Sequence, residues 1–413
     1  MFLRRCFCAV AFLIACKMFA QSSTNSFAPD PARLQIVRRI LKESPLIDGH
    51  NDLPWEFRKL CTNQLDTIDL THDTTSSGLV TDLPRLKAGG LGGQFWSVYV
   101  PGELTNGAAV TAVLEQIDVV HRLIARYPND LELALTADDI VRIHREGKIA
   151  SLIGMEGGHS IGNSLGALRM MYALGARYMT LTHIKNNDWA DSATDTPAHH
   201  GLTPFGEEVV REMNRLGMLV DLSHVSDETM VAAMRISKAP VIFSHSSARA
   251  LCHHARDVPD DILKMVTTNG GLVMVTFVPE YLTEPDRLDE IAVTAERKRL
   301  AGLYPGDDAK VKPAVADWRK THPDPRKATL LDVADHIDHV RAVAGIDHLG
   351  IGSDYEGFHN PPAGLEDVSC YPALLAELLK RGYSEDDIKK VAGQNLLRVL
   401  RAAEQVATQL NSR

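Results

Sequence analysis

Several apolar runs of this chain end in a histidine or an acidic residue. The first run ends with His50 and Asp52, which lie two residues apart and would therefore point to the same side of a strand. A single histidine at a strand end is more often an ordinary core residue, but imidazoles and carboxylates that converge from separate segments are ligands of zinc and similar divalent ions. Five later runs each end in one such residue, in the order Glu156, His183, His224, His245 and Asp354.

Seven potential ligands are more than one tetrahedral zinc ion can use. Two divalent ions about 3.5–4 Å apart, bridged by a carboxylate and a hydroxide, would use them. Such a pair of ions lowers the pKa of bound water toward about 7 and so generates a nucleophile at neutral pH. The residue types therefore predict a hydrolase with a dinuclear metal centre.

The apolar runs indicate the elements that must position these residues. The runs are continuous rather than alternating, which is typical of strands buried on both faces of a parallel sheet. The strand candidates are Pro45–Trp55, Gly93–Val100, Ile149–Gly157, Ala176–His183, Met218–His224, Val241–His245, Leu272–Phe277 and Leu349–Asp354. Helical spacing of apolar residues lies between several of them, at Ala108–Tyr127, Leu165–Leu174, Phe205–Leu216, Asp227–Ser237 and Asp260–Thr267.

Eight strands that alternate with helices predict an α/β protein, a (β/α)8 TIM-like barrel of the metal-dependent hydrolase type. The carboxyl ends of the strands form one ring in this fold, and active sites occupy that ring. A doubly wound open sheet is the alternative. It would require a glycine-rich phosphate motif that opens a helix, whereas the glycine-rich segment 86–93 precedes a strand.

Residues 30–410 are predicted to form a single catalytic domain. Two polar insertions interrupt its pattern, at Cys61–Leu86 after the first strand and at Pro279–Lys327 between the last two strands. Long loops of this kind are usually functional. The second insertion is expected to contain a helix over Arg287–Leu303 and to form a lid (residues 279–327) at the mouth of the barrel.

Composition and charge exclude some classes of protein. Hydrophobic residues make up 45% and charged residues 23%, which excludes disorder over most of the chain. The net charge of −9 and the aromatic content of 6% argue against a nucleic-acid-binding protein. At most one disulfide is expected in the body of the chain, which keeps Cys61, Cys252 and Cys370.

The first residues are typical of an export signal. Arg4 and Arg5 precede an apolar run over residues 6–16, which is shorter than the about 20 residues that a membrane-spanning helix needs. Residues 1–20 are therefore predicted to be a signal peptide. The alternative is a lipoprotein signal that ends at Cys16, because Leu13-Ile14-Ala15-Cys16 resembles a bacterial lipobox. Either signal predicts an exported protein, periplasmic or secreted, that contacts a membrane only through a lipid on Cys16.

The body of the chain, from Ile36 to Glu404, resembles the membrane dipeptidase (renal dipeptidase) family, peptidase family M19. Seven stretches carry the resemblance: Ile47-Asp48-Gly49-His50-Asn51-Asp52, Glu156-Gly157-Gly158, Leu181-Thr182-His183, Asp221-Leu222-Ser223-His224-Val225-Ser226, Pro240-Val241-Ile242-Phe243-Ser244-His245-Ser246-Ser247, Gly364-Leu365-Glu366-Asp367-Val368-Ser369 and Asn395-Leu396-Leu397-Arg398. One position departs from the mammalian members, because Lys185 replaces a cysteine that they use in a disulfide.

The resemblance implies a distorted barrel with two zinc ions and assigns a role to each site residue. His50 and Asp52 would bind one ion, His224 and His245 the other, and Glu156 would bridge them. His183 would contact the substrate and stabilise the oxyanion, and Asp354 would carry the proton from the attacking water to the leaving amine. The residues implied on the substrate side are Arg256, for the carboxylate of the substrate, and Tyr281.

The implied function is that of an exported dinuclear-zinc dipeptidase. Its substrate would be a dipeptide with a free C-terminal carboxylate, and a D-residue at the C-terminal position is plausible for a bacterial relative. The alternative is a metal-dependent amidohydrolase that acts on N-acyl-(D-)amino acids, which also present an amide and a carboxylate. A non-catalytic periplasmic binding protein is a remote alternative. No nucleic-acid partner is expected, and a homodimer is left open.

Overall fold

A parallel β-sheet that closes on itself forms the centre of the computed structural model, which describes residues 29–323 and 328–412. Eight of its strands form the ring, because β2 pairs with both β1 and β4. Their order around the ring is β2-β1-β9-β8-β7-β6-β5-β4. The strands are β1 (Leu46–Asn51), β2 (Leu91–Tyr99), β4 (Ile149–Glu156), β5 (Ala176–Thr180), β6 (Leu219–Asp221), β7 (Ile242–Phe243), β8 (Leu272–Val275) and β9 (Leu349–Ile351).

The predicted (β/α)8 barrel is therefore confirmed. Seven of the eight predicted runs contain a whole strand of the ring, and the run Gly93–Val100 overlaps β2, which begins two residues earlier. A ninth strand, β3 (Leu131–Leu133), was not predicted. It pairs with β4 from Ile149 to Ser151, and β5 pairs with the same side of β4 from Ile153 onward. With only three residues, β3 is too short to produce a recognisable apolar run.

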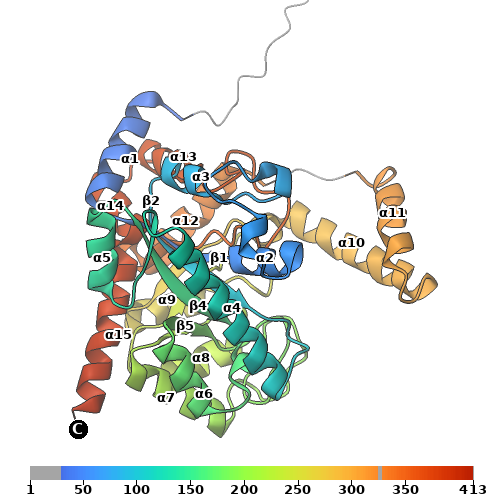
Figure 1. The fold of residues 1–413 in the computed structure, drawn as a ribbon, viewed down its shortest axis with the longest axis horizontal. Coiled ribbons are helices and arrows are strands. Elements are labelled where there is room, and N and C mark those ends of the chain that lie inside the picture. The colour runs from blue at the N-terminus through green and yellow to red at the C-terminus, as the bar shows by residue number, and fades with distance from the viewer. Residues whose placement is uncertain (1–28, 324–327, 413) are drawn as a thin grey trace, which may run out of the picture.

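Helices surround the ring (Figure 1). Several begin at a side chain that caps the first turn, for example Thr136, which exchanges hydrogen bonds with Asp139 in a capping box. The predicted helical segments coincide with α4, α6, α7, α8 and α9 to within a few residues. The helices packed around the barrel are α1 (Pro31–Glu43), α2 (Leu53–Cys61), α3 (Leu83–Ala88), α4 (Asn106–Arg126), α5 (Ala137–Arg145), α6 (Leu165–Ala173), α7 (Pro204–Leu216), α8 (Asp227–Ile236), α9 (Asp260–Asn269), α12 (Leu330–Ala344), α13 (Tyr371–Lys380), α14 (Glu385–Lys389) and α15 (Asn395–Asn411).

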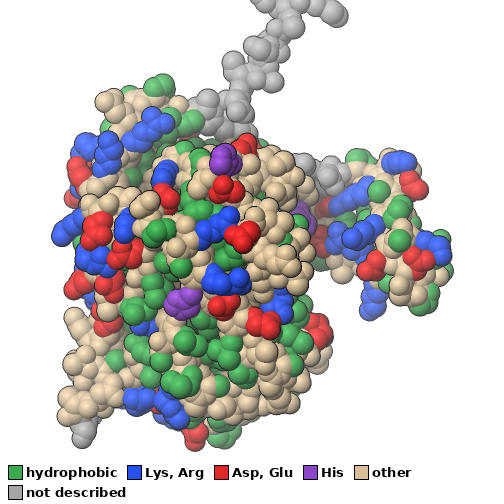
Figure 2. Space-filling model, viewed as in Figure 1, with side chains coloured by type: hydrophobic (Ala, Val, Ile, Leu, Met, Phe, Trp, Pro, Cys, Tyr) green, Lys and Arg blue, Asp and Glu red, His purple; other side chains and the backbone are tan. Residues whose placement is uncertain are grey.

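Two further helices form an arm that projects from the barrel, to the right in Figure 1. They are α10 (Glu284–Leu303), which covers the predicted helix, and α11 (Asp308–Arg319), which was not predicted. The arm (residues 284–319) follows the short 3-10 helix η4 (Pro279–Tyr281), its base after β8. Figure 2 shows basic and acidic side chains interspersed over the arm. The lid function of residues 279–327 stays a prediction.

The strands of the ring are buried along almost their whole length, as the continuous apolar runs predicted. All eight residues of β4 are buried, and so are the five of β5. Cys61, Cys252 and Cys370 are all free thiols. Among the described helices, none combines the length and the hydropathy of a membrane span. The predicted signal peptide and the lipobox at Cys16 lie outside the described residues.

Candidate metal and active site

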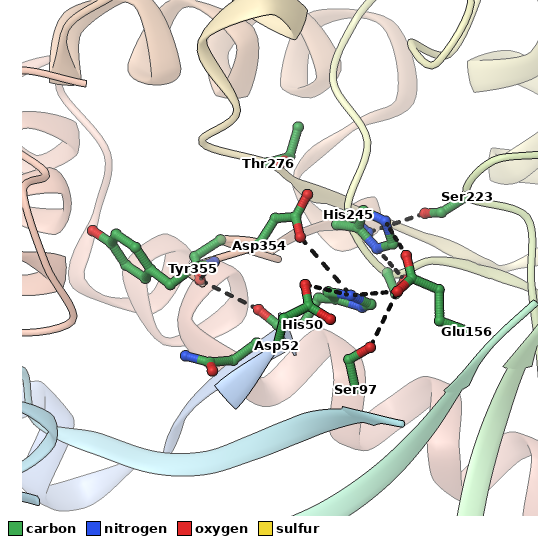
Figure 3. Close-up of polar contacts among 12 residues, drawn as sticks. His50, Asp52, Ser97, Glu156, Ser223, His245, Thr276, Asp354 and Tyr355 are labelled. Atoms are coloured by element: carbon green, nitrogen blue, oxygen red, sulfur yellow. Dashed lines mark hydrogen bonds and ion pairs between the residues drawn. The ribbon is translucent and has the colours of Figure 1, made fainter. Parts of the chain in front are cut away.

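The carboxyl ends of six strands bring the seven predicted residues together. Figure 3 shows His50, Asp52, Glu156, His245 and Asp354 gathered at this place. Backbone hydrogen bonds between neighbouring strand ends fix their places. The amide of Asp52, after β1, donates to the carbonyl oxygen of Tyr355, and the amide of Asp354, after β9, donates to that of His50. His224 and Asp354 have φ values of 70° and 67°. Residues other than glycine rarely adopt this left-handed backbone, and such strain concentrates at functional sites.

Glu156, the last residue of β4, contacts two groups of side chains. Its Oε2 atom lies 3.5 Å from Nε2 of His50 and accepts a hydrogen bond of 3.2 Å from Ser97. Its Oε1 atom lies 3.1 Å from Nε2 of His224 and 3.6 Å from Nε2 of His245. Each oxygen of the carboxylate therefore faces a different group, which is the arrangement that a bridging ligand requires.

The first group contains His50, Asp52 and Asp354. Nε2 of His50 lies 3.5 Å from Oδ2 of Asp52 and 3.9 Å from Oδ1 of Asp354. Nε2 of His50 and Oδ1 of Asp52 are buried and have no hydrogen-bond partner. Buried polar atoms are nearly always satisfied, so these two unpaired atoms indicate a ligand that binds here.

The second group contains His183, His224 and His245. The Nε2 atoms of His224 and His245 are only 2.9 Å apart, and Nε2 of His183 lies 3.6 Å from Oε1 of Glu156. The rings of His183 and His224 are tilted against each other with centroids 4.4 Å apart. Three imidazoles therefore converge on one oxygen of Glu156.

Burial and charge set the protonation states of the carboxyl groups. Burial opposes ionisation of Glu156, but the facing imidazoles of His50 and His183 hold its pKa well below the usual range. Burial raises the pKa of Asp354 well above its usual value, and Asp52 and Glu156 add to that effect while His50 opposes it. Glu156 is thus ionised, as a metal ligand must be, and Asp354 has the raised proton affinity of a general acid or base.

The imidazoles differ from one another. Burial holds the pKa of both His224 and His245 well below the usual value, so these rings are neutral. Neutral imidazole is the form that binds metal. At His50 burial is outweighed by Tyr178 and the facing carboxylates, which raise its pKa well above the usual value. The potential around His50 is therefore negative and suits a cation.

These groups fit a metal centre in composition and in spacing. Their candidate ligand atoms lie within 4.8 Å of one another in three overlapping sets, each of which contains nitrogen and oxygen donors. The predicted ligands His50, Asp52, Glu156, His224 and His245 all belong to these sets, as do the predicted catalytic residues His183 and Asp354.

Arg256 and Tyr281 lie beside the second group. Arg256 is almost completely buried, and its Nη2 donates to the carbonyl oxygen of His245 while its Nη1 donates to Ser246. Its guanidinium lies 5.3 Å from the centroid of the Tyr281 ring, and its Nε has no partner. A buried cation with an unused donor suits a carboxylate of the substrate.

Sequence reasoning missed two side chains that support the ligands. Ser97 donates to Glu156, and Tyr178 contacts His50. Both lie inside predicted strands without a distinguishing pattern, so only the three-dimensional pairing identifies them. The segment Gly158–Gly162 matches the Gly-x-Ser-x-Gly pattern of serine hydrolases, but Ser160 is wholly buried in a 3-10 helix and is not presented as a nucleophile.

A cavity of about 620 Å³ opens between the arm, together with its base, and the loop after β9. Charged residues of both signs line it, including Glu280, Asp289 and Lys312. Gly357 lines it as well, and a Cβ atom at Gly357 would lie 2.4 Å from Oδ1 of Asp354. The cavity therefore adjoins the candidate site on the side of Asp354.

A closed (β/α)8 barrel with histidines and carboxylates at its carboxyl end is the architecture of a metal-dependent hydrolase. The model of one family, the membrane dipeptidases of peptidase family M19, matches residues 34–413. The chain belongs to this family, and it is an enzyme of the metallodipeptidase type.

Solved structures agree with this membership. The probable dipeptidase PvdM from Pseudomonas aeruginosa is 27% identical, with a TM-score of 0.77 over 91% of this chain and 99% of that one. Dipeptidase AC, a metallopeptidase of family M19, is 26% identical, with a TM-score of 0.72 over 87% and 98%. A metallopeptidase from Rhodobacter sphaeroides, solved with a phosphinate mimic of the dipeptide L-Ala-D-Ala, is 25% identical, with a TM-score of 0.72 over 87% and 99%.

Proposed function

We propose that this protein is a dinuclear-zinc dipeptidase that cleaves dipeptides with a free C-terminal carboxylate. The observation that carries the proposal is the position of Glu156, whose two oxygens face two separate groups of nitrogen and oxygen donors. His50 and Asp52 would hold one ion, and His224 and His245 the other. When bound, the two ions supply a water of lowered pKa as nucleophile and polarise the carbonyl of the substrate.

The residues of the chain supply positioning and proton transfer. Asp354, whose pKa burial raises, accepts the proton of the attacking water and returns it to the leaving amine. His183, next to Oε1 of Glu156, donates a hydrogen bond to the oxyanion that develops on the carbonyl. These roles place an acid-base group on one side of Glu156 and an oxyanion donor on the other.

Arg256 selects for a free carboxylate. Its Nε–H lacks a partner inside a buried site, so a substrate without a carboxylate would leave it unsatisfied. The ring of Tyr281 lies against the guanidinium and limits where the substrate can lie. The likeness to a metallopeptidase that was solved with a mimic of L-Ala-D-Ala supports acceptance of a D-residue at the C-terminal position.

Metal content and turnover test the proposal together. We expect about two zinc ions per chain, cleavage of L-L and L-D dipeptides, and loss of cleavage after chelation that zinc restores. Glu156→Gln should reduce both zinc content and turnover, whereas removal of the exposed His72 by His72→Ala should change neither. Full cleavage by the metal-free protein would contradict the proposal. Two ions without dipeptide cleavage but with cleavage of N-acyl-amino acids would reassign the substrate.

We also propose that the enzyme acts outside the cytoplasm, on the basis of Arg4, Arg5 and the apolar residues 6–16. Fractionation of cells that express the full chain should recover activity in the periplasm or medium. Substitution Cys16→Ala distinguishes the two signals, since it would prevent lipid attachment to a lipoprotein, as read by mass spectrometry, and leave a protein cut at residue 20 unaffected. Activity that remains in the cytoplasm would contradict export.

A further inference from the structure

Two buried aspartates hold the ring together in the same way on two sides of the site. Asp221, the last residue of β6, accepts hydrogen bonds from the amide of Ser244 at 2.9 Å and from its hydroxyl at 2.5 Å. Asp48 in β1 accepts the same two bonds from Ser353, at 2.7 Å and 2.6 Å. In both cases one carboxylate oxygen takes the amide and the other takes the hydroxyl. Each serine immediately precedes a residue of the site, His245 or Asp354.

The two pairs differ in the contact that the serine makes with the next residue. Oγ of Ser244 lies 2.8 Å from Nδ1 of His245. Because the Ser244 hydroxyl gives its proton to Asp221, its oxygen is left to accept the proton on Nδ1. The ring of His245 then carries hydrogen on Nδ1 and a lone pair on Nε2. That lone pair belongs to the atom that lies 2.9 Å from Nε2 of His224 and 3.6 Å from Glu156.

Burial raises the pKa of the Asp221 carboxyl, and the hydrogen bonds that it accepts oppose this effect and favour its ionised form. In addition to Ser244 it accepts hydrogen bonds from the hydroxyl of Thr180, at 2.8 Å, and from the amide of Ser223, at 3.0 Å. Four donors therefore occupy its two oxygens. With Asp221 ionised, the hydrogen bonds run from Nδ1 of His245 to Ser244 and from Ser244 to Asp221.

The three imidazoles assigned as ligands are held differently. Nδ1 of His224 is buried without a partner, and Nδ1 of His50 meets the hydroxyl of Tyr178. Of these three rings, only His245 is connected to a carboxylate through its Nδ1. A ligating histidine whose other nitrogen donates to a carboxylate is a stronger and better oriented ligand, and mutation of such a partner typically costs about 10–100-fold in metal affinity.

We propose that Asp221 and Ser244 are positioning residues that fix the tautomer and the orientation of His245 as a metal ligand. The inference rests on the proposed function for the identity of His245 as a ligand, and it adds a serine between the carboxylate and the imidazole. The ligand His245 is thereby linked to a carboxylate, whereas His50 at the other proposed metal position is held by the neutral hydroxyl of Tyr178.

The pair Asp48 and Ser353 provides a matched control. Ser353→Ala removes a hydroxyl of the same burial and the same bond to an aspartate as Ser244→Ala does. It also removes longer contacts, among them one to the carbonyl oxygen of His50 at 3.4 Å and one with the hydroxyl of Tyr371 at 3.3 Å, neither of which involves an imidazole nitrogen. The residue after Ser353 is an aspartate without an Nδ1 atom, so no imidazole loses a partner. In both alanine variants the aspartate keeps the amide bond from the substituted residue.

The first measurement is zinc affinity by competition with a chromogenic chelator, on folded protein checked by circular dichroism. We expect Ser244→Ala and Asp221→Asn each to weaken the affinity for one of the two zinc ions about 10–100-fold. Ser353→Ala should change the affinity for either ion less than about 3-fold. Wild-type affinity in Ser244→Ala would overturn the proposal, and so would an equal loss in Ser353→Ala, which would indicate general loosening of the barrel.

The second measurement needs neither metal nor activity. In metal-free protein with ¹⁵N-labelled histidine, the His245 ring, assigned with a His245→Asn variant, should show the Nδ1–H tautomer. Ser244→Ala should shift it toward Nε2–H or a mixture, and Ser353→Ala should not. An Nε2–H ring in the wild-type protein would overturn the proposal. If the wild-type protein binds no zinc but His245 shows the expected tautomer, the proposed function fails while the hydrogen-bond chain stands.

Discussion

The hydroxyl of Tyr178 lies 2.8 Å from Nδ1 of His50, deep inside the barrel. The same hydroxyl donates to the carbonyl oxygen of Gly49, at 3.1 Å, so its oxygen is free to accept the proton of Nδ1. Space for the tyrosine depends on Gly154, where a Cβ atom would lie 2.1 Å from its ring. A neutral side chain thus orients His50, whereas a carboxylate acts on His245 through Ser244.

Substitution Tyr178→Phe should therefore weaken the binding of zinc at the position of His50. The variant removes one hydroxyl and leaves Nδ1 of His50 and the carbonyl of Gly49 buried without a partner, which typically costs about 1–3 kcal/mol. We expect about a 10-fold weaker affinity for one zinc ion and a lower melting temperature, measured by chelator competition and calorimetry. Unchanged affinity for both ions would show that this hydroxyl does not support the ligand.

Substitution Arg256→Lys should raise KM more than it lowers kcat. Lysine keeps the charge but loses the planar fork that donates to His245 and Ser246 while presenting Nε to the substrate. We expect KM for a dipeptide to rise at least about 10-fold, in line with about 1.5–3 kcal/mol for hydrogen bonds to charged groups. Steady-state kinetics on the same dipeptide with an amidated C-terminus gives the control, because both enzymes should process it equally poorly.

Substitution Asp354→Asn should abolish most turnover and spare the metals. It keeps the size of the side chain and removes the group that accepts and returns the proton, whose contribution is typically about 10²–10⁴-fold. We expect kcat to fall within that range, two zinc ions to remain, and KM to change little. A variant with only one zinc ion would instead identify Asp354 as a ligand, in agreement with its distance of 3.9 Å from Nε2 of His50.

Substitution Gly357→Ala should disturb the site without unfolding the barrel. A Cβ atom at this position would lie 2.4 Å from Oδ1 of Asp354 and 2.5 Å from Oδ2 of Asp52, so both carboxylates must move. We expect at least about a 10-fold loss of kcat/KM, because displacements of about 1 Å can cost about 100-fold. Gly107→Ala, where the added atom would meet nothing within 4 Å, is the matched control and should retain activity.

The free energy of unfolding should depend on pH through His336. Burial lowers the pKa of this α12 residue to about 4, and its Nδ1 accepts from the amide of Ala248 while its Nε2 donates to the carbonyl of Leu282. The unfolded state binds the proton more tightly, with a pKa of about 6.5. The contribution of His336 to the free energy of unfolding is therefore present in full above about pH 6.5. It is lost as the pH falls toward 4, by about 3 kcal/mol in total.

Glutamine can replace both hydrogen bonds of His336 and does not titrate. The His336→Gln variant should therefore lose less stability than the wild-type protein between pH 7 and pH 4.5, as measured by urea unfolding. Other histidines titrate equally in both proteins, so the difference between the two curves isolates His336. Parallel curves would show that the neutral ring does not contribute to acid sensitivity.

The sequence predicted most of the barrel because its strands are buried on both faces and therefore read as continuous apolar runs. It also predicted the site, because residues such as His224 and Asp354 interrupt these runs at their ends. Strand β3 was not predicted because three residues give no recognisable pattern. Helix α11 was not predicted because none of its side chains is buried.

The side chains that hydrogen-bond to the proposed metal ligands could not be predicted from the sequence. Asp221 and Ser244 lie 23 residues apart, and nothing in their local sequence indicates that one accepts from the other. Tyr178 resembles any aromatic residue of a buried strand until its hydroxyl is seen beside His50. Spacing identifies residues that point the same way along one strand, whereas contacts between strands depend on how the ring closes.

The bond between Asp48 and Ser353 spans 305 positions, and it has a consequence for how the protein is made. A ribosome completes β1 early and β9 late, so the nascent chain carries Asp48 without its serine donors through most of synthesis. Until then its buried carboxylate would have only partners such as Gln94 on β2. Unpaired buried charge is costly, so the ring stays open until the last strand arrives. A chain that stops short of β9 lacks both Ser353 and Asp354, so the hydrolytic centre can be completed only late in synthesis.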